Sequence, residues 1–461
     1  MAGYQFSRAP KKVPLIETKH RTIKTEIPTP GTEQILNQLD QVESRSMHGQ
    51  LPLVWDKAKG HSIYDKAGNK WIDFTSTIFV TNIGHANEHL ASSLRKMLDQ
   101  QLVHSYAYAN EPRLHYLKKL VEFAGPPFEK AFLLSAGTEA TEAALKLMRM
   151  HGQTQGKRKL GVICIESNWH GRTMGAQMMS SNIKQKEWVG YLDPNIHHIP
   201  FPYPWLIENE AAAERFLATG LKKITDSGVD LSKDICGFML ETFQGWGAVF
   251  YPKAFVKSIE RICRSNGALL AFDEMQAGFA RTGKRFGFEH YEVEPDLIAV
   301  GKGMGSGFPI SGVLGRKHIM DLPEVGNMSS THSANPLVSA AGLATLEEIE
   351  RLELISETER KGELLFKGLA DIQASFPDRI SYILGKGLIA AVLFKKPGSN
   401  EPDTVFPSYV SERAMQKGLL VVHTGRESIK LGPPLVIGDD ALLEGIAALK
   451  ESITEIDRES R

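Results

Sequence analysis

The amino-acid sequence predicts an α/β protein with a larger and a smaller domain. The chain has 461 residues, which is more than one small hydrophobic core usually organises. Between residues 79 and 335, apolar strand-like runs alternate with helical segments, and this alternation is typical of a largely parallel sheet. From residue 336 onward the pattern changes, so residues 336–461 predict the main part of a smaller α+β domain.

The N-terminal segment, residues 1–50, predicts an exposed and partly ordered arm. Basic residues and prolines are interspersed in its first thirty positions, and no apolar core of signal-peptide length follows them. Residues 51–78 then contain short alternating strands joined by turn residues, including Ala67-Gly68-Asn69. We assign residues 51–78 to a small meander that belongs to the smaller domain.

The larger domain, residues 79–335, contains several apolar runs that predict strands. These runs are Lys130 to Ser135, Gly161 to Glu166, Gly237 to Glu241, Ala268 to Asp273 and Leu297 to Val300. Ligands of such sheets bind at the carboxyl ends of the strands, so residues directly after each run are candidates for a site. In the smaller domain we expect a long helical stretch, two groups of short strands and a closing helix. They are Leu337 to Leu369, Ile383 to Leu393 with Gly418 to His423, and a helix from Asp439.

The composition excludes several classes of partner. Lysine and arginine together number 54, as do aspartate and glutamate, so the chain has no bias toward nucleic acid or an acidic membrane surface. Cys164, Cys236 and Cys263 are widely spaced in apolar segments, which predicts buried free thiols in a reducing compartment and no zinc or other metal framework. No apolar run approaches the roughly 20 residues of a membrane-spanning helix. We expect a cytoplasmic protein.

Two polar residues at the ends of apolar runs suggest a cofactor. Lys302 enters a glycine-rich loop after the run that ends at Val300, and Asp273 ends the run that begins at Ala268. Pyridoxal phosphate needs a lysine amine for a Schiff base with its aldehyde and a carboxylate that keeps its pyridine nitrogen protonated. Taken singly, Lys302 can equally be interpreted as an ordinary charged loop residue, and Asp273 as a residue that ends a strand and caps the next helix. Together with further motifs, the pair favours the cofactor.

Three further motifs supply the other contacts that this cofactor needs. Gly137 and Thr138 lie in a strand, glycine turn and helix, where free N–H groups could bind a phosphate; a plain helix cap is the alternative. Trp169 follows a strand and could stack on the pyridine ring, although a core tryptophan is the competing interpretation. Gln276 lies three residues after Asp273 and can reach the phenolic oxygen of the cofactor.

From Leu53 onward, these blocks in this order resemble the class III, or omega-amino acid, aminotransferases of pyridoxal-phosphate fold type I. The most specific block is Asp273-Glu274-Met275-Gln276-Ala277-Gly278-Phe279-Ala280-Arg281-Thr282-Gly283, followed by Lys302-Gly303-Met304-Gly305. The resemblance implies a mostly parallel seven-stranded sheet in the larger domain. It also implies roles for the residues: Lys302 as catalytic Schiff-base lysine, Asp273 at the pyridine nitrogen, Gln276 at the phenolic oxygen, Gly137 and Thr138 at the phosphate, and Trp169 on the ring.

Two more residues gain roles from the resemblance alone. Glu241 matches a family glutamate near the cofactor, although a carboxylate at the end of a strand is often only a cap. Thr331 matches a threonine that reaches the phosphate of a partner subunit, so the resemblance implies a homodimer with shared active sites. A Ser/Thr/Asn-rich stretch before a proline is otherwise usually a loop.

The chain departs from its family at two positions that concern the substrate. Many relatives carry Gln-Gly-Glu and an arginine shortly before Pro-Pro, and this arginine grips the carboxylate of glutamate or 2-oxoglutarate. Here Trp246 replaces the glutamate and Lys430 the arginine. Lysine lacks the planar fork of arginine, so we expect Trp246 and Lys430 to serve a different substrate pair. Arg426 is a candidate mobile carboxylate ligand, but a solvated loop arginine is the more common case.

The implied function is transamination, in which the amino group of a primary, terminal amine or amino acid passes to a keto acid or aldehyde. Lys302 can move the required proton near neutral pH only if its surroundings depress its pKa. A racemase or epimerase of the same fold is the alternative, because it would use Lys302 and Asp273 in the same way. A nucleotide-binding loop is disfavoured, since the glycines follow Lys302 instead of preceding it.

Overall fold

The computed structural model describes residues 4–460, and the chain forms two units, each with its own core. Unit 1 contains the chain up to Asn87, Trp246–Ala248 and the chain from Ser356, whereas unit 2 contains Glu88–Gly245 and Val249–Ile355. The expected domain boundaries at residues 79 and 336 therefore differ from the observed ones. Helix α11 (Pro336–Arg351) belongs to unit 2 because it packs against α3 (Glu88–Asp99) and α4 (Glu111–Ala124).

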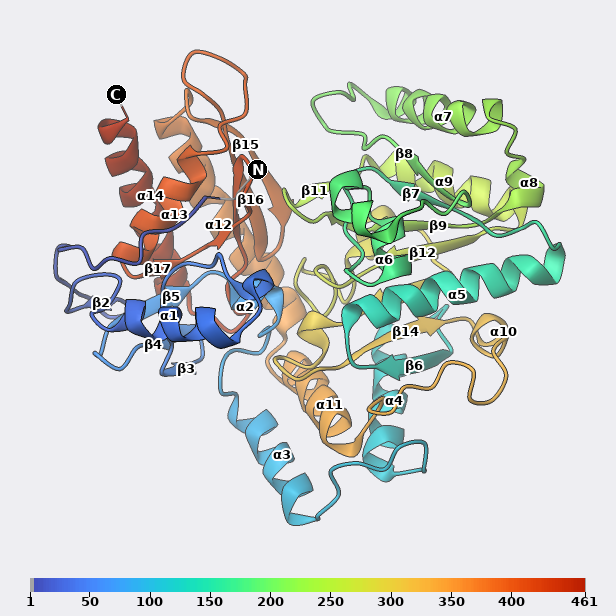
Figure 1. Ribbon diagram of the computed structural model, residues 1–461, viewed down its shortest axis with the longest axis horizontal. Coiled ribbons are helices and arrows are strands. Elements are labelled where there is room, and N and C mark those ends of the chain that lie inside the picture. Colours follow the sequence, from blue (N-terminus) through green and yellow to red (C-terminus); the bar gives the residue numbers. More distant parts are fainter. Residues whose placement is uncertain (1–3, 461) are drawn as a thin grey trace. The chain divides into compact units, whose positions relative to one another are not determined.

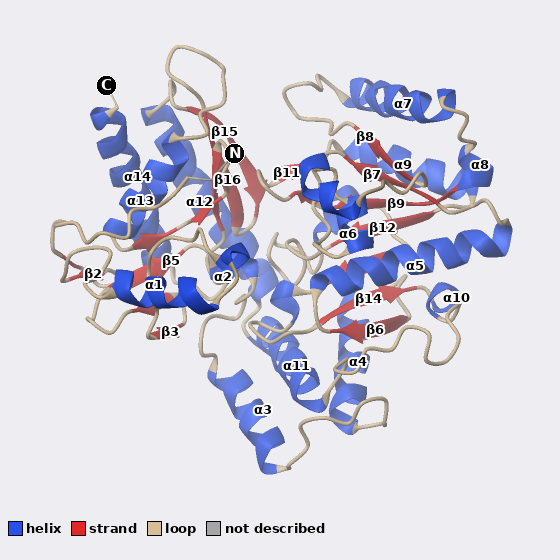
Figure 2. Ribbon diagram, viewed as in Figure 1, coloured by secondary structure: helices blue, strands red, loops and turns tan. Residues whose placement is uncertain are grey.

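Unit 2 is built on a seven-stranded mixed sheet, which confirms the predicted architecture (Figures 1 and 2). In spatial order the strands are β6 (Lys130–Leu134), β14 (Ser311–Gly315), β13 (Leu297–Val300), β12 (Leu269–Asp273), β9 (Ile235–Glu241), β7 (Gly161–Ile165) and β8 (Ile196–Ile199). Strand β14 runs antiparallel to both of its neighbours, and the remaining pairs are parallel. A short ribbon of β10 (Phe243–Gln244) and β11 (Val249–Phe250) follows β9.

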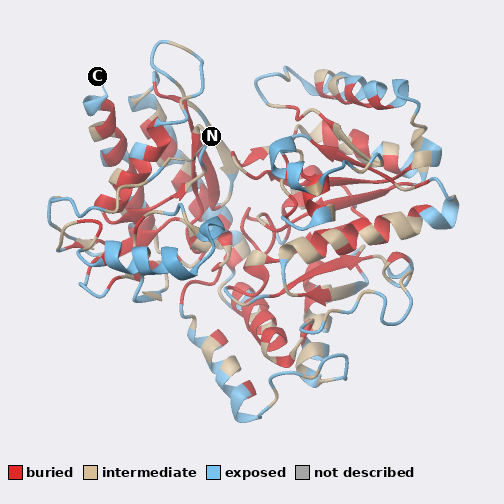
Figure 3. Ribbon diagram, viewed as in Figure 1, coloured by how far each residue is buried: buried red, intermediate tan, exposed pale blue. Residues whose placement is uncertain are grey.

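Helices cover both faces of this sheet because side chains alternate along each buried strand. Helix α5 (Gly137–Gln155) packs against β14, β13 and β9, and its small residues Ala140 and Ala144 share a core with Ala271 and Ala299. Helix α9 (Lys253–Asn266) packs against β12 and β9, and α7 (Glu210–Asp226) packs against α9. Figure 3 shows that the strands between them are buried. The remaining helices of unit 2 are α6 (Met174–Met179), α8 (Leu231–Asp234) and α10 (Lys317–Met320).

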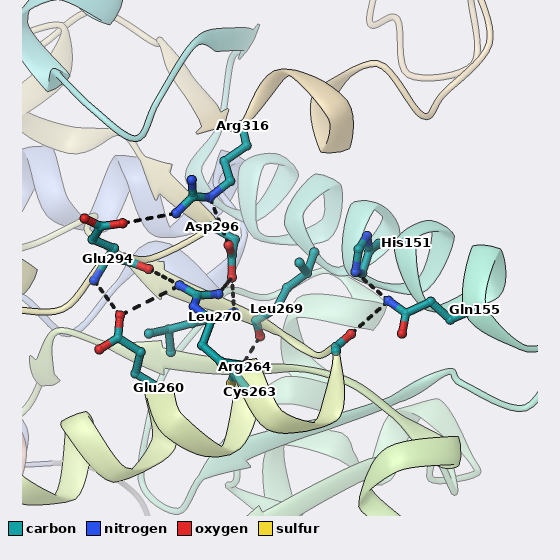
Figure 4. Close-up of polar contacts among 11 residues, drawn as sticks. His151, Gln155, Glu260, Cys263, Arg264, Leu269, Leu270, Glu294, Asp296 and Arg316 are labelled. Carbon is teal, nitrogen blue, oxygen red and sulfur yellow. Dashed lines mark hydrogen bonds and ion pairs between the residues drawn. The ribbon is translucent and has the colours of Figure 1, made fainter.

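An ion-pair cluster around the buried Asp296 fixes the amino-terminal ends of the central strands, with partly exposed arginines as partners (Figure 4). Asp296 Oδ2 accepts hydrogen bonds from Arg264 Nη1 at 2.6 Å and from the Leu270 amide at 2.9 Å, and its Oδ1 accepts one from Arg316 Nε at 3.1 Å. These partners come from α9, β12 and the residue after β14. The cluster therefore sets the register of β12 against β13, whose opposite ends carry Asp273 and lead to Lys302.

Unit 1 contains two sheets and four longer helices. The first sheet contains β1 (Ile16–Glu17), β2 (Thr22–Ile23), β5 (Lys70–Asp73), β4 (Ser62–Tyr64) and β3 (Lys57–Lys59), with β17 (Leu419–Leu420) parallel to β5. The second contains β15 (Ile380–Lys386), β16 (Ile389–Phe394), β19 (Ser428–Leu431) and β18 (Val422–His423). The helices are α1 (Thr32–Val42), α12 (Leu354–Ser375), α13 (Phe406–Gln416) and α14 (Asp439–Glu459).

Two expectations for these segments need correction. The N-terminal arm is not simply exposed, because Ile23 and Ile27 are buried in a core with Ile63 and Trp71. The helical stretch expected from Leu337 to Leu369 is interrupted, because it consists of two helices, α11 and α12. They are separated at Glu353, whose backbone has a left-handed φ of 51°, and neither glycine nor proline marks this break in the sequence.

An unusual backbone segment follows β5. The four residues of α2 (Ser76–Phe79) have φ values of 44°, 52°, 63° and 65°, so they form a left-handed turn without a glycine. Each non-glycine residue in this conformation costs about 1–2 kcal/mol, and such strain is often found at functional sites. Ser76 Oγ anchors the turn by donating to the Gly432 carbonyl at 2.6 Å. A Cβ on Gly432 would lie 2.3 Å from the Phe79 ring, so the two segments pack closely.

Two smaller observations concern the cysteines and the apolar character of the helices. The three cysteines are free and buried, which confirms that part of the sequence interpretation. Within residues 4–460, none of the helices combines the length and apolar character needed to cross a membrane.

Candidate active site

A cavity of about 200 Å³ opens at the carboxyl ends of the strands of unit 2. Its lining residues are Gly137, Thr138, Trp169, His170, Gly171, Glu241, Asp273, Met275, Gln276 and Lys302. Seven of the eight residues expected to bind a cofactor are in this set, and Thr331 is the exception. The cavity therefore brings together residues from segments that are far apart in the sequence.

Lys302 enters the cavity from the short 3₁₀ helix Lys302–Met304, directly after β13 and Gly301. Its own backbone is left-handed, with a φ of 44°, a conformation that costs a lysine about 1 kcal/mol or more. A Cβ at Gly301 would lie 2.7 Å from Met275 Sδ, so only glycine allows this approach. Burial lowers the pKa of Lys302, and the Asp273 and Glu241 carboxylates partly oppose that effect.

Asp273 ends β12 and is almost fully buried beside His170, a residue that the sequence interpretation missed. His170 Nδ1 donates to Asp273 Oδ2 at 2.9 Å, and the Met275 amide donates to Asp273 Oδ1 at 3.0 Å. Among residues 4–460, the buried His170 Nε2 has no hydrogen-bond partner. These two donors fix the orientation of the Asp273 carboxylate, which would be the partner of a cofactor's pyridine nitrogen.

Glu241, at the end of β9, is a second buried carboxylate in the cavity. Its Oε2 accepts hydrogen bonds from the amides of Trp169 at 3.1 Å and Gly245 at 3.2 Å. Burial, assisted by the nearby Asp273 carboxylate, raises the pKa of Glu241 to about 7. A Cβ at Gly245 would lie 2.5 Å from Gln276 Nε2 and 2.7 Å from Glu241 Oε1, so this glycine lets both side chains approach.

The amino terminus of α5 forms another part of the lining. Within the described chain, the amides of Gly137 and Thr138 have no hydrogen-bond acceptor, whereas Glu139 Oε2 accepts from the preceding Ser135 and Ala136 amides at 2.9 Å. The hydroxyls of Thr138 and Thr173 lie 2.6 Å apart. A Cβ at Gly171, whose φ is 145°, would lie 2.3 Å from Thr138 Oγ1. Two open amides, a hydroxyl and the positive end of a 19-residue helix suit a phosphate group.

Trp169 lies partly buried in the cavity lining, and the Arg172 guanidinium carbon is 4.6 Å from the centre of its ring. Thr331 lies outside the cavity and is exposed, and its carbonyl accepts a hydrogen bond from His104 Nε2 at 2.9 Å. The two tentative substrate residues belong to unit 1. Lys430 is 3% exposed, with Nζ 4.3 Å from the centre of the Phe79 ring, whereas Trp246 is partly buried beneath Arg426.

Comparison with known proteins shows the family of this chain. The model of the family described as aminotransferase class-III matches residues 44–453 of this chain. The chain belongs to the class-III aminotransferases. The enzyme is 32% identical over 403 residues to the mitochondrial acetylornithine aminotransferase of Candida glabrata, covering 86% of this chain and 88% of that one. It is 31% identical over 444 residues to the 4-aminobutyrate aminotransferase of Mycobacterium leprae, with 93% and 97% covered.

Solved structures agree with this assignment. The ornithine aminotransferase of Toxoplasma gondii is 26% identical and superposes with a TM-score of 0.81 over 95% of this chain and 97% of that chain. A second structure of the Toxoplasma enzyme, which also matches this aminotransferase, is described as holding pyridoxal phosphate at partial occupancy in its active site. This class-III aminotransferase is accordingly an enzyme that uses pyridoxal 5'-phosphate to transfer amino groups.

Proposed function

We propose that the enzyme takes the amino group from a terminal primary amine of an amino acid and passes it to a keto acid or aldehyde, using the cavity of unit 2. One observation carries this proposal: a lysine amine with a lowered pKa, a buried aspartate and an open helix amino terminus line the same small cavity. These are the three contacts that pyridoxal phosphate requires. When bound, this cofactor supplies an aldehyde and an electron-withdrawing ring.

The residues of the cavity have separate roles in this proposal. The α5 amides of Gly137 and Thr138 would bind the phosphate, and Asp273 would hold a proton on the pyridine nitrogen. His170 orients Asp273 through the 2.9 Å hydrogen bond and so acts as a positioning residue. Lys302 Nζ would then remove the proton from the carbon that carries the substrate amine, because burial favours its neutral, basic form.

Three other residues complete the proposed cofactor site. The Trp169 ring would stack on the pyridine, and Gln276 would bind the phenolic oxygen. Glu241 would lie beside the ring, where its raised pKa lets it hold a proton near neutral pH. These roles are supported by the presence of all three side chains in one cavity lining.

We also propose a homodimer with shared active sites. Thr331 is exposed and outside the cavity of its own chain, which fits a residue that contacts the phosphate in a partner subunit. Three free, buried cysteines fit a reducing compartment, so we propose a cytoplasmic location. Sedimentation at several protein concentrations tests the first proposal, and cell fractionation tests the second.

The substrates named for the relatives support a donor with a terminal amine. Acetylornithine, 4-aminobutyrate and ornithine are amino acids, and the last two carry an amine remote from the carboxylate. We propose that Trp246 and Lys430 contribute to the selection of such a substrate in this enzyme. Trp246 adds apolar bulk, and Lys430 supplies a cation whose ammonium group is held over Phe79.

The test is a half-reaction with the purified holoenzyme. Incubation with 4-aminobutyrate or ornithine, without any acceptor, should give one equivalent of carbonyl product per active site and convert the cofactor to its aminated form. A matched reaction with Lys302→Ala should give neither. Conversion of ornithine, which unlike 4-aminobutyrate is chiral, to its mirror image without carbonyl product would instead assign the enzyme to the racemases.

A further inference from the structure

A chain of two hydroxyl groups joins the amino terminus of α5 to Glu142, which lies one turn further along the same helix. Thr138 Oγ1 lies 2.6 Å from Thr173 Oγ1, and Thr173 Oγ1 lies 2.6 Å from Glu142 Oε1. Both distances lie in the range of well-formed O–H···O hydrogen bonds, so each contact needs a proton between its two oxygens. Of these three residues, only Thr138 lines the cofactor cavity.

The direction of both hydrogen bonds follows from the chemistry of the carboxylate. An ionised carboxylate can only accept, so the Thr173 hydroxyl donates its single proton to Glu142. The contact between the two threonines therefore uses the proton of Thr138, which donates to Thr173 Oγ1. The Thr173 amide in turn donates to Thr138 Oγ1 at 3.3 Å. In this arrangement the Thr138 hydroxyl has no proton left for a phosphate group in the cavity.

Glu142 does not depend on Thr173 to hold its position. Its Oε1 also accepts from the Gly175 and Ala176 amides, at 2.8 Å and 3.2 Å. These amides belong to the first turn of α6, which has no cap from the side chain of Thr173, so Glu142 fills that role. A Cβ at Gly175 would lie 2.8 Å from Glu142 Oε2, so a side chain there would displace the carboxylate. The carboxylate can therefore release the Thr173 hydroxyl and remain in place.

We propose that Glu142 is a positioning residue that competes with the phosphate of the cofactor for this hydroxyl chain. Without phosphate, Thr138 donates to Thr173 and Thr173 donates to Glu142. When a phosphate lies at the amino terminus of α5, both hydroxyls rotate, so that Thr173 donates to Thr138 Oγ1 and Thr138 donates to a phosphate oxygen. No proton leaves its own oxygen. This inference rests on the proposed function, and it means that Glu142 weakens phosphate binding, because its hydrogen bond from Thr173 is lost when the chain reverses.

The first experiment measures binding to the apoenzyme without any reaction. Glu142→Gln replaces the carboxylate with a neutral amide, which is a weaker acceptor for Thr173 but can still accept from the Gly175 and Ala176 amides. We expect its Kd for inorganic phosphate, measured by competition with pyridoxal phosphate in equilibrium dialysis, to fall severalfold. Its Kd for pyridoxal, which has no phosphate, should stay unchanged, whereas a purely structural Glu142 would weaken the binding of both ligands. Glu88→Gln removes an exposed carboxylate from α3 and is the matched control.

Thr173→Val separates the hydroxyl chain from simple charge repulsion. Valine keeps the shape of threonine and removes the hydroxyl that joins Thr138 to Glu142. In this background, Glu142→Gln should lose most of its effect on the Kd for phosphate, because the two residues are no longer connected. An effect of the same size in both backgrounds would show that the charge acts through space, and it would overturn the inference. Thr173→Ser restores the hydroxyl and should restore the full effect of Glu142→Gln.

The outcomes distinguish this inference from the proposed function. An enzyme that transfers amino groups while Glu142→Gln binds phosphate no more tightly than the wild type overturns the inference and leaves the function intact. A wild-type apoenzyme that binds no inorganic phosphate also overturns the inference. Tighter phosphate binding by Glu142→Gln that depends on Thr173, in a protein that transfers no amino group, supports the hydroxyl chain and refutes the proposed function.

Discussion

The raised pKa of Glu241 predicts how the stability of the apoenzyme depends on pH. The folded state holds the proton more tightly than the unfolded chain, so this contribution is fully present below pH 4.5 and is lost as pH rises through about 7. At about 1.4 kcal/mol per pH unit, the interval from 4.5 to about 7 corresponds to about 3 kcal/mol. Glu241→Gln cannot titrate, so it should remove roughly 2–3 kcal/mol of stability change between pH 5 and pH 8.

Glu241→Gln isolates the titration because one oxygen of Glu241, Oε2, accepts both hydrogen bonds described above. The amide oxygen of glutamine can still accept from the Trp169 and Gly245 amides. Urea unfolding of cofactor-free protein at several pH values measures the effect, and taking differences between pH values cancels any pH-independent cost. Glu88→Gln, on the exposed surface of α3, is the control. If Glu241→Gln and wild type lose the same stability from pH 5 to pH 8, the assignment of a raised pKa is wrong.

Further substitutions test other parts of the structure. His170→Leu should raise the Kd for pyridoxal phosphate about tenfold in equilibrium dialysis, because Asp273 loses a buried donor. An unchanged Kd would show that His170 has no role in cofactor binding. Asp296→Asn should lower the free energy of unfolding by about 1–2 kcal/mol with cofactor affinity retained, since two partly exposed arginines lose their charged acceptor. Lys430→Ala should raise KM for 5-aminopentanoate severalfold, and an unaltered KM would contradict a substrate role. Ile78→Asn should raise the free energy of unfolding by up to about 1 kcal/mol, because asparagine tolerates the left-handed backbone better.

The alternation of apolar runs with helices predicted the main sheet well. The observed β6, β7, β9, β12 and β13 match the expected runs to within about two residues at each end. Strand β14 reads Ser-Gly-Val-Leu-Gly, which is less apolar than the other runs, and its antiparallel direction depends on pairing that no local pattern encodes. The break at Glu353 was missed because neither glycine nor proline, the usual signals of a helix end, occurs there.

The sequence predicted those site residues whose roles follow from a short contiguous motif. Lys302, Asp273 and Gln276 belong to contiguous blocks, and all three line the cavity. His170 adjoins Trp169 in the sequence, yet its contact with Asp273 joins residues more than a hundred positions apart. The sequence favoured a solvated loop arginine at Arg426, because its cation–π contact with Trp246 is likewise non-local. Thr331 lies outside the cavity of its own chain, and its role stays a prediction.

The central claim is that Lys302 and Asp273 bind pyridoxal phosphate for amino transfer from a terminal amine. The most direct measurement is the visible absorbance spectrum of the purified holoenzyme before and after addition of primary amines and amino acids without an acceptor. The account predicts a visible band of bound cofactor that 4-aminobutyrate or a related terminal amine bleaches, with the spectrum of the aminated cofactor appearing in its place. A band that persists with every amine, or no band even after pyridoxal phosphate is added, would contradict it.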